Sequence, residues 1–237
     1  HDLISLDYAA EMGGRACGSA GGGCQFLGTA ATAQVVAEAF GMSLPHSALS
    51  PSGEPIWLDI AHRSALALLN LSENQIGIDQ ILTQKALENA MLLHAAFGGS
   101  TYLLLHIPAV VHAAGLPLPT VEDWNRINRQ TPRLVDALPN GPTNHPTVQV
   151  FMAGGVPEVM LHLHQMGLLH ADVLTVAGEN LGVILDWWEQ SERRQQVRER
   201  LAAAGAIDPD RVIMDADTAK SRGLSSTVVF PTGNIAP

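Results

Sequence analysis

The chain has 237 residues, of which 46% are apolar and 15% charged, a composition typical of a folded globular protein and not of a disordered one. Its 13 basic and 23 acidic residues give a net charge of −10. That charge opposes nucleic-acid binding through a basic face, because neutralising phosphates needs clustered Lys and Arg. No apolar run reaches the ~18 residues of a membrane span. We therefore expect neither a nucleic-acid nor a membrane partner.

The first half of the chain predicts mainly helices. Residues 29–40 form an Ala- and Val-rich segment that stops at Gly41, and a glycine at that point is a common helix C-terminal signal. Thr120 followed by Asp123 predicts a capping box at the start of another helix. Further helices are expected up to residue 12, from Pro55 to about residue 70, and over residues 83–96 and 102–114.

The second half predicts short strands between helices. Residues 134–138, between Pro132 and Pro139, predict a short buried strand, and residues 172–177 predict a strand by their β-branched content. The shorter segments 211–214 and 227–230 are two more strand candidates. Helices are expected over residues 156–166 and in one long segment that runs through Trp187 and Trp188 to Gly205. Glutamates are interleaved with the basic residues of this segment, which indicates a solvated face. Short apolar strands alternating with helices favour an α/β fold, here a three-layer α/β/α domain with a mostly parallel sheet and a helix-rich first half.

The segment 103–114 is apolar nearly all round. A helix that is apolar on every side must be buried within its domain or by a partner. We therefore expect this helix to be covered, and the protein to associate with itself.

Both cysteines of the chain, Cys17 and Cys24, lie in the glycine-rich segment 13–32. Two cysteines cannot form the disulfide framework of a small secreted domain, which favours a cytoplasmic protein. The segment is neither a phosphate loop, since no lysine follows its glycines, nor a dinucleotide fingerprint, since Phe26 takes the place of the third glycine. A cysteine just ahead of a helix N-terminus suits a reactive or metal-bound sulfur. The alternative is a small buried hydrophobic side chain.

Ten histidines raise the question of a metal site. His162 and His164 lie two apart on an expected helix and therefore point to different faces. His94, His106 and His112 fall on apolar helices, which favours core or interface positions. No H-E-x-x-H pattern is present, nor a G-x-S-x-G nucleophile elbow. We expect no histidine zinc site.

From Cys24 onwards the chain resembles the dihydroxy-acid and sugar-acid dehydratases, the IlvD/Edd family. The sequence CQFLGTAAT at 24–32, followed by EAFGMSLP at 38–45, is similar to the family pattern C-G-G-M-Y-T-A-N-T-M with E-A-L-G-x-S-L-P at the same offset. Residues 89–115, 152–178 and 233–237 agree as well. The sequences GGGCQFLGTA, LPHSAL and FPTGNIAP are most like the branch that includes xylonate dehydratases.

The resemblance implies a hydro-lyase that converts a sugar acid, such as D-xylonate, to a 2-keto-3-deoxy acid. An iron–sulfur cluster, [2Fe–2S] or [4Fe–4S], would act on the departing C3 hydroxyl, and a divalent metal, typically Mg²⁺, would stabilise the enolate formed at C2. Cys24 is the one residue that matches a cluster ligand, and Cys17 matches none. No residue of this chain matches a ligand of the divalent metal.

The resemblance also implies a domain arrangement. Residues 1–232 match the latter part of the family's N-terminal domain, and residues 233–237 match the start of the linker to a C-terminal domain. The other cysteines and the Asp-Cys-Lys metal motif would lie upstream, and the catalytic base, a serine, in the C-terminal domain. The chain alone is thus expected to be inactive and to hold no cluster.

The sequence departs from the family pattern at four positions. Ala31 and Tyr102 replace asparagines that many relatives carry, and Phe26 and Leu27 favour the sugar-acid branch. One alternative is the dihydroxy-acid dehydratase of branched-chain amino-acid synthesis. Another is a catalytically silent scaffold or dimerisation domain. Relatives are typically homodimers or homotetramers, which agrees with the expected self-association.

Overall fold

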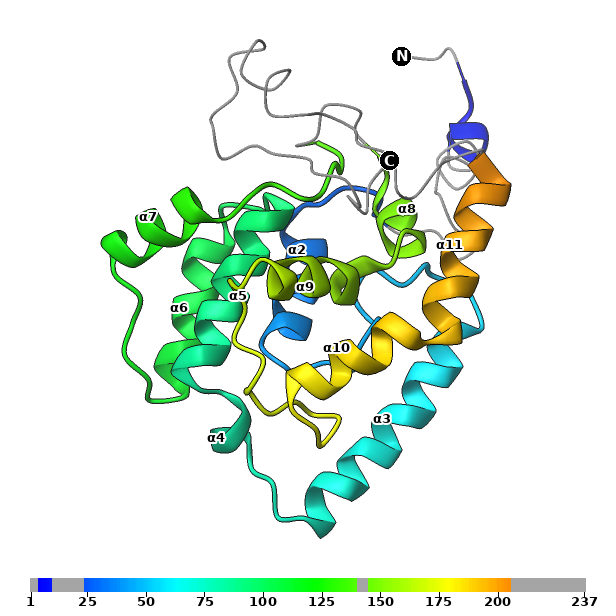
Figure 1. Cartoon of the computed structure of the whole chain (residues 1–237). Helices are drawn as coiled ribbons and strands as arrows, with labels where there is room; N and C mark the ends of the chain where they lie inside the picture. Colours follow the sequence, from blue (N-terminus) through cyan, green and yellow to red (C-terminus); the bar gives the residue numbers. More distant parts are fainter. Residues whose placement is uncertain (1–3, 10–23, 140–144, 206–237) are drawn as a thin grey trace.

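The computed structural model describes residues 4–9, 24–139 and 145–205, which form a layered packing of helices (Figure 1). Within these ranges the one β pairing is an isolated antiparallel bridge between Leu174 and Asn180. The expected three-layer α/β/α domain with a parallel sheet is therefore wrong for the described part of the chain. Two of the predicted strands, 211–214 and 227–230, lie outside the described residues. So do residues 10–12, the last part of the helix predicted up to residue 12.

The other two predicted strands are buried segments that bond to helix ends and loops. The N–H groups of Leu134 and Val135 both donate to the carbonyl of Ala96, at 2.9 and 3.3 Å. The N–H of Val176 donates to the carbonyl of Gly41 at 2.8 Å. Leu134, Val135 and Val173 are 4% exposed or less. Their β-branched and apolar side chains thus reflect burial, which favours the same residue types as strand pairing does.

Two helices form the centre of the molecule. Helix α5 (Gln84–Phe97) is capped by the Thr83 hydroxyl, which accepts from the Ala86 N–H at 3.2 Å, and it ends at Gly98 in the left-handed conformation. Most of its side chains are buried. Helix α2 (Thr29–Ala39) packs against α5 and ends just before Gly41, which has φ +77°. Both helices lie close to their predicted limits.

Helices α6 (Leu103–Ala113) and α7 (Val121–Gln130) cover one side of α5 (Figure 1). The predicted capping box is confirmed: the Thr120 hydroxyl accepts from the Asp123 N–H, and the Asp123 carboxylate accepts from the Thr120 N–H. Helix α6 buries one face only. Leu103, Ile107 and Val111 are at most 1% exposed, whereas Leu105 is 68% exposed. The chain by itself therefore leaves part of this helix uncovered, and cover by a partner stays a prediction.

On the opposite side lie α8 (Thr147–Met152), α9 (Gly155–Gln165), α10 (Leu181–Gln190) and α11 (Glu192–Gly205). The long helix predicted through Trp188 to Gly205 is broken at Ser191, whose ψ is 138°. The Ser191 hydroxyl accepts from the Arg194 N–H at 3.1 Å. A serine hydroxyl that bonds this way starts a new helix.

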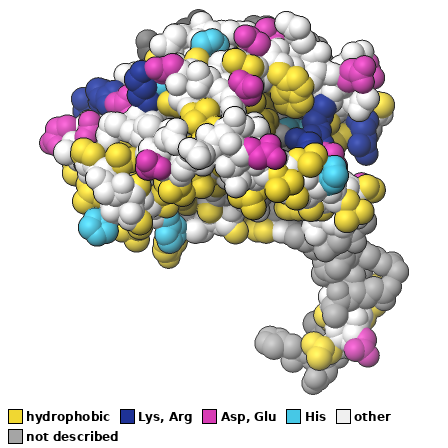
Figure 2. Space-filling model, turned by 90° about the horizontal axis from the view of Figure 1, so that it is seen from below, with side chains coloured by type: hydrophobic (Ala, Val, Ile, Leu, Met, Phe, Trp, Pro, Cys, Tyr) yellow, Lys and Arg dark blue, Asp and Glu magenta, His cyan; other side chains and the backbone are white. Residues whose placement is uncertain are grey.

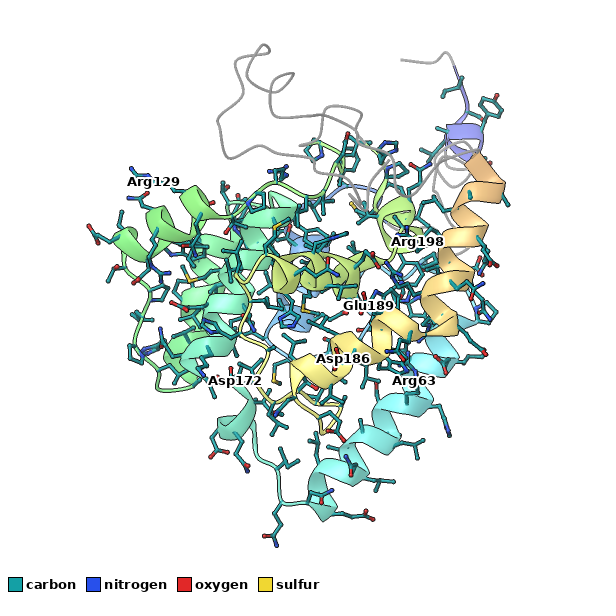
Figure 3. The ribbon with its side chains drawn as sticks, in the orientation of Figure 1. Arg63, Arg129, Asp172, Asp186, Glu189 and Arg198 are labelled. Atoms are coloured by element: carbon teal, nitrogen blue, oxygen red, sulfur yellow. The ribbon has the colours of Figure 1, made fainter. Side chains whose placement is uncertain are left out.

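A buried carboxylate joins α9 to α10 and α11. Glu158 is 1% exposed and accepts from the Arg194 guanidinium through both oxygens, each at 2.7 Å, and from the Trp188 indole at 3.0 Å. Arg198 lies 3.5 Å from the same carboxylate; its place on α11 is labelled in Figure 3. The basic residues of α11 therefore do not form the purely solvated face that the sequence indicates.

Helix α3 (Ile56–Glu73) extends along the edge of the molecule towards the short helix α4 (Ile78–Ile81) (Figure 1). Ile60 is the one buried residue of α3, while Leu58 and Leu69 are 78% and 60% exposed. Seen from below, hydrophobic side chains are spread over the surface between charged ones (Figure 2). None of the helices in the described ranges combines the length and apolar character that crossing a membrane requires.

Candidate functional site

Cys24 belongs to an extended segment, residues 24–28, that enters α2 and is fixed on two sides. The N–H of Leu27 donates to the carbonyl of Leu138 at 2.6 Å. Thr147, the first residue of α8, donates its N–H to the Gln25 carbonyl at 3.1 Å and its hydroxyl to the Cys24 carbonyl at 3.3 Å. Residues far apart in sequence thereby set the backbone position of Cys24.

The thiol of Cys24 is exposed. Its sulfur lies 3.8 Å from the carbonyl oxygen of Phe26, within its own segment. The interpretation of this cysteine as a small buried hydrophobic side chain is therefore excluded. An exposed thiol on a fixed backbone can act as a nucleophile or bind a metal, because its sulfur is accessible.

Cys24 lines a cavity of about 250 Å³ between α2, α8 and the loop that follows α2. Ala30 and Ala31 from the first turn of α2 contribute to its wall, as do residues 49–52 and Trp57. The N-terminus of α2 therefore borders the Cys24 cavity, as the sequence indicates. No side chain caps this end of α2.

The loop 46–49 is attached to α2 through two side chains. The Glu38 carboxylate, 3% exposed, accepts from the N–H groups of His46, Ser47 and Ala48 at 2.7, 3.2 and 2.8 Å. Gln34 accepts from the N–H of Leu49 at 2.9 Å. Burial raises the pKa of Glu38 from 4.5 to about 7, the three backbone donors opposing this rise.

A larger cavity of about 760 Å³ lies on the other side of the segment and is lined by Phe26, Gly28, Ser100 and Arg133, among others. The Ser100 N–H donates to the Thr32 hydroxyl at 3.0 Å, which ties this wall to α2. Burial lowers the pKa of Arg133 to about 10, so its guanidinium stays charged at neutral pH. The cavity therefore combines one cation with hydroxyl groups.

The histidines are dispersed. The His94 ring lies 3.0 Å from the Ser100 carbonyl and is 7% exposed, as a core histidine should be. His106 and His112 are exposed on α6. His162 lies 3.8 Å from Glu158, whereas His164 is exposed on another face, so the prediction that this pair diverges is confirmed. In the described ranges no three His, Cys, Asp or Glu side chains group as a metal site would require.

The predicted site residues separate into groups. Ala31, which stands where relatives carry asparagine, lines the Cys24 cavity, whereas Tyr102 is 61% exposed at the start of α6. Phe26 is half-exposed in the larger cavity, and Leu27 is in the core. Cys17 lies outside the described residues.

Sequence reasoning missed Glu38, Gln34 and Thr147. A signal for Glu38 was available: it lies three residues after Val35 and seven after Ala31, on the buried face of a helix. A charged side chain in a core register is a candidate for a specific role. No local pattern marks Thr147, because its partner is more than a hundred residues away.

Comparison with known proteins agrees with the resemblance. The family model described as "Dihydroxy-acid/6-phosphogluconate dehydratase N-terminal" matches residues 1–187. The chain therefore belongs to the IlvD/Edd dehydratase family, a family of hydro-lyases.

Two relatives from Escherichia coli (strain K12) match nearly the whole chain. The protein named D-xylonate dehydratase YjhG is 62% identical over 234 residues, which is 99% of this chain and 36% of that protein. D-xylonate dehydratase YagF is 61% identical over 237 residues, with the same 36% share. A protein named dihydroxy-acid dehydratase from Crocosphaera subtropica is 41% identical over 183 residues, 77% of this chain and 31% of that protein. The chain spans about a third of the length of these relatives.

Proposed function

We propose that this chain is part of a hydro-lyase that dehydrates an aldonic acid, with D-xylonate as the first candidate, to a 2-keto-3-deoxy acid. One observation carries this proposal: the 62% identity to a protein named D-xylonate dehydratase extends over 99% of the chain. The proteins named dihydroxy-acid dehydratase are more distant and cover less of it. The branched-chain substrate is therefore the second candidate.

The residues around Cys24 fit a role in holding an iron–sulfur cluster. Such clusters are bound by cysteine thiolates, and the Cys24 thiol is exposed on a backbone fixed by Thr147. We propose that Cys24 supplies one ligand and that the others, with the ligands of a divalent metal such as Mg²⁺, come from outside the described residues. When bound, these cofactors supply Lewis acidity to the departing hydroxyl and to the carboxylate side of the substrate.

The chain's own residues would shape the site next to the cluster. Ser50 and Ser52 contribute to the wall of the Cys24 cavity, and polar residues of this kind suit a ligand that carries hydroxyl groups. The Ser50 hydroxyl also donates to the Ser47 carbonyl at 2.7 Å, which holds this part of the wall in place. Leu49, Ala31 and Trp57 line the same cavity with apolar surface, which limits the access of water. In this proposal the cavity orients the substrate, while the proton at C2 is removed by a group outside the described ranges.

Substrate preference tests this function. The intact protein that carries this chain, purified with its cofactors, is incubated with D-xylonate and with 2,3-dihydroxyisovalerate, and the 2-keto products are quantified. We expect kcat/KM to be at least tenfold higher for D-xylonate, equivalent to about 1.4 kcal/mol of transition-state binding. A preference for 2,3-dihydroxyisovalerate would favour the second candidate, and turnover of neither substrate would contradict the proposal.

We also infer that a second copy of the protein covers the exposed apolar side chains of α3 and α6. Leu58, Leu69 and Leu105 are each at least 60% exposed. Large apolar side chains left exposed on α3 and α6 favour contact with a partner, since extensive exposed apolar surface is characteristic of interaction sites. A homodimer or homotetramer would bury them.

A further inference from the structure

Glu38 is the one charged side chain on the buried face of α2, and its position requires an explanation. A buried carboxylate is costly unless hydrogen bonds compensate for lost hydration. Three consecutive backbone N–H groups, those of residues 46–48, provide the compensation at 2.7 to 3.2 Å. The hydrogen bonds that the Glu38 carboxylate accepts in the described part of the chain all come from the backbone of this one turn.

The turn that Glu38 holds has an unfavourable backbone conformation. His46 and Leu49 have φ values of 59° and 64°, in the left-handed region, and neither is a glycine. Such residues persist only when their surroundings impose the conformation, and they concentrate at functional sites. The surroundings here are Glu38 and Gln34 on one side and the Phe151 carbonyl, 3.0 Å from the His46 ring nitrogen, on the other.

The residues that leave this turn form the wall of the Cys24 cavity. Leu49, Ser50, Pro51 and Ser52 all line it, opposite the segment that carries the cysteine. The Trp57 indole donates to the Pro51 carbonyl at 3.0 Å and fixes the far end of the same stretch. A change in the turn at 46–49 would therefore move this wall relative to the thiol.

We propose that Glu38 is a positioning residue of the Cys24 site, with Gln34 as its auxiliary. By holding the turn at residues 46–49, in which His46 and Leu49 have left-handed conformations, the carboxylate places the wall 49–52 against which the sugar acid is oriented. The part that concerns substrate rests on the proposed function. The part that concerns the cavity depends only on the contacts of Glu38 and Gln34 with residues 46–49.

The cavity is tested in the 237-residue chain with a fluorine probe. In a Cys17→Ala background, Cys24 is alkylated with bromotrifluoroacetone, and its ¹⁹F resonance is recorded under conditions where circular dichroism shows a folded protein. Glu38→Gln keeps the size of the side chain but turns an NH₂ group towards backbone donors. We expect a shifted or split resonance, and amide exchange at residues 46–48 about fivefold faster or more. Glu73→Gln, which removes an exposed carboxylate on α3, should change neither.

A purely structural role would lower the stability of Glu38→Gln and leave the resonance of the folded protein at its original position. That result overturns the proposal. If Glu38→Gln does not fold, Glu38→Asp shortens the side chain by one methylene group, which lengthens the bonds to residues 46–48 without turning an NH₂ group towards them. It should shift the resonance in the same direction by a smaller amount, and an unchanged resonance would again overturn the proposal. Gln34→Leu would not serve this purpose, because Gln34 itself lines the Cys24 cavity.

The substrate part is tested in the intact protein. Glu38→Gln should raise KM for D-xylonate about fivefold or more while the iron and sulfide content stays unchanged, because Thr147 and not Glu38 fixes the Cys24 backbone. A shifted ¹⁹F resonance with an unchanged KM would refute the positioning of substrate. If the unsubstituted protein does not dehydrate aldonates, the proposed function fails, whereas the ¹⁹F result still decides the role of Glu38 in the cavity.

Discussion

Two buried titratable side chains next to each other, Glu38 and His46, have opposite pKa shifts. Burial raises the pKa of Glu38 from 4.5 to about 7 and lowers that of His46 from 6.5 to about 3. Between pH 4.5 and 6.5 the folded state keeps a proton on Glu38 that the unfolded state releases, so this group makes the unfolding free energy fall as pH rises. The unfolded state binds a proton on His46 that the folded state lacks, so this group makes the unfolding free energy rise with pH.

Glu38→Gln should therefore separate the two contributions. The variant loses the Glu38 contribution, which decreases the unfolding free energy as pH rises, and keeps the His46 contribution, which increases it. Its unfolding free energy should therefore increase more steeply with pH between 4.5 and 6.5 than that of the parent chain. Urea unfolding at several pH values in this range measures the slope. Equal slopes in the two proteins would mean that Glu38 does not retain its proton in the folded state.

At the residue scale, sequence could identify Cys24 but could not decide its environment. Its neighbours in sequence predict flexible backbone before a helix, whereas its exposure depends on Thr147 and Leu138, which lie far along the chain. The family resemblance supplied the role that local chemistry left open. Glu38 was predictable from helical register, but its partners in the turn were not, because no local pattern shows that Leu49, a residue that rarely adopts a left-handed conformation, does so here.

At the scale of elements, capping residues and glycine stops predicted the helices well. Thr120 with Asp123 and Gly41 each lie at the helix end that the sequence indicates. The strands predicted at 134–138 and 172–177 were wrong because burial alone explains their apolar and β-branched residues. The break at Ser191 was missed because the residues before it and the residues after it both have a helical pattern.

The Glu158 contacts should be the largest single polar contribution to the packing of α11. Glu158 is 1% exposed and the Arg194 side chain 26% exposed, so Glu158→Gln removes the buried partner of a partly buried guanidinium, which should lower the unfolding free energy by about 3 kcal/mol. Asp59→Asn is the matched control, since Asp59 bonds to Arg63 and Arg193 at 2.9 Å but is about half-exposed. Figure 3 marks Arg63 on α3.

The control substitution should cost less than about 1 kcal/mol, because exposed ion pairs contribute little. Urea denaturation of both variants, followed by tryptophan fluorescence, measures the two values. Similar losses for Glu158→Gln and Asp59→Asn would show that the buried carboxylate is not the dominant contact.

Exposed leucines on α3 allow a test of self-association. Leu58→Ser together with Leu69→Ser removes two side chains that are 78% and 60% exposed in the single chain. If a second copy covers them, the dissociation constant of the oligomer should rise about tenfold or more. Met166→Ser, exposed at the C-terminal end of α9 and on neither α3 nor α6, should leave it unchanged. Light scattering over a concentration series gives both values, and a monomeric parent protein at micromolar concentration would contradict the inference.

At the scale of the whole molecule, the described helices build one wall of a site and not a complete one. Cys24, the turn held by Glu38 and the N-terminus of α2 meet at a single cavity. The chain covers about a third of the length of its relatives, so we propose that the other ligands and the catalytic base come from sequence that this chain does not contain. The resemblance predicted the family and the substrate branch, whereas composition and periodicity alone predicted a fold with a sheet that the described residues lack.

The central claim is that Cys24 binds the iron–sulfur cluster of a sugar-acid dehydratase. Its most direct test is the iron and sulfide content of the intact protein, purified anaerobically, with either cysteine of this chain replaced by alanine. Cys24→Ala should lose the cluster, and D-xylonate dehydration with it, while the helical fold is retained because the thiol is exposed and packs in no core. Cys17→Ala should keep a full cluster. A full cluster and undiminished turnover in Cys24→Ala, with loss of both in Cys17→Ala, would contradict the account.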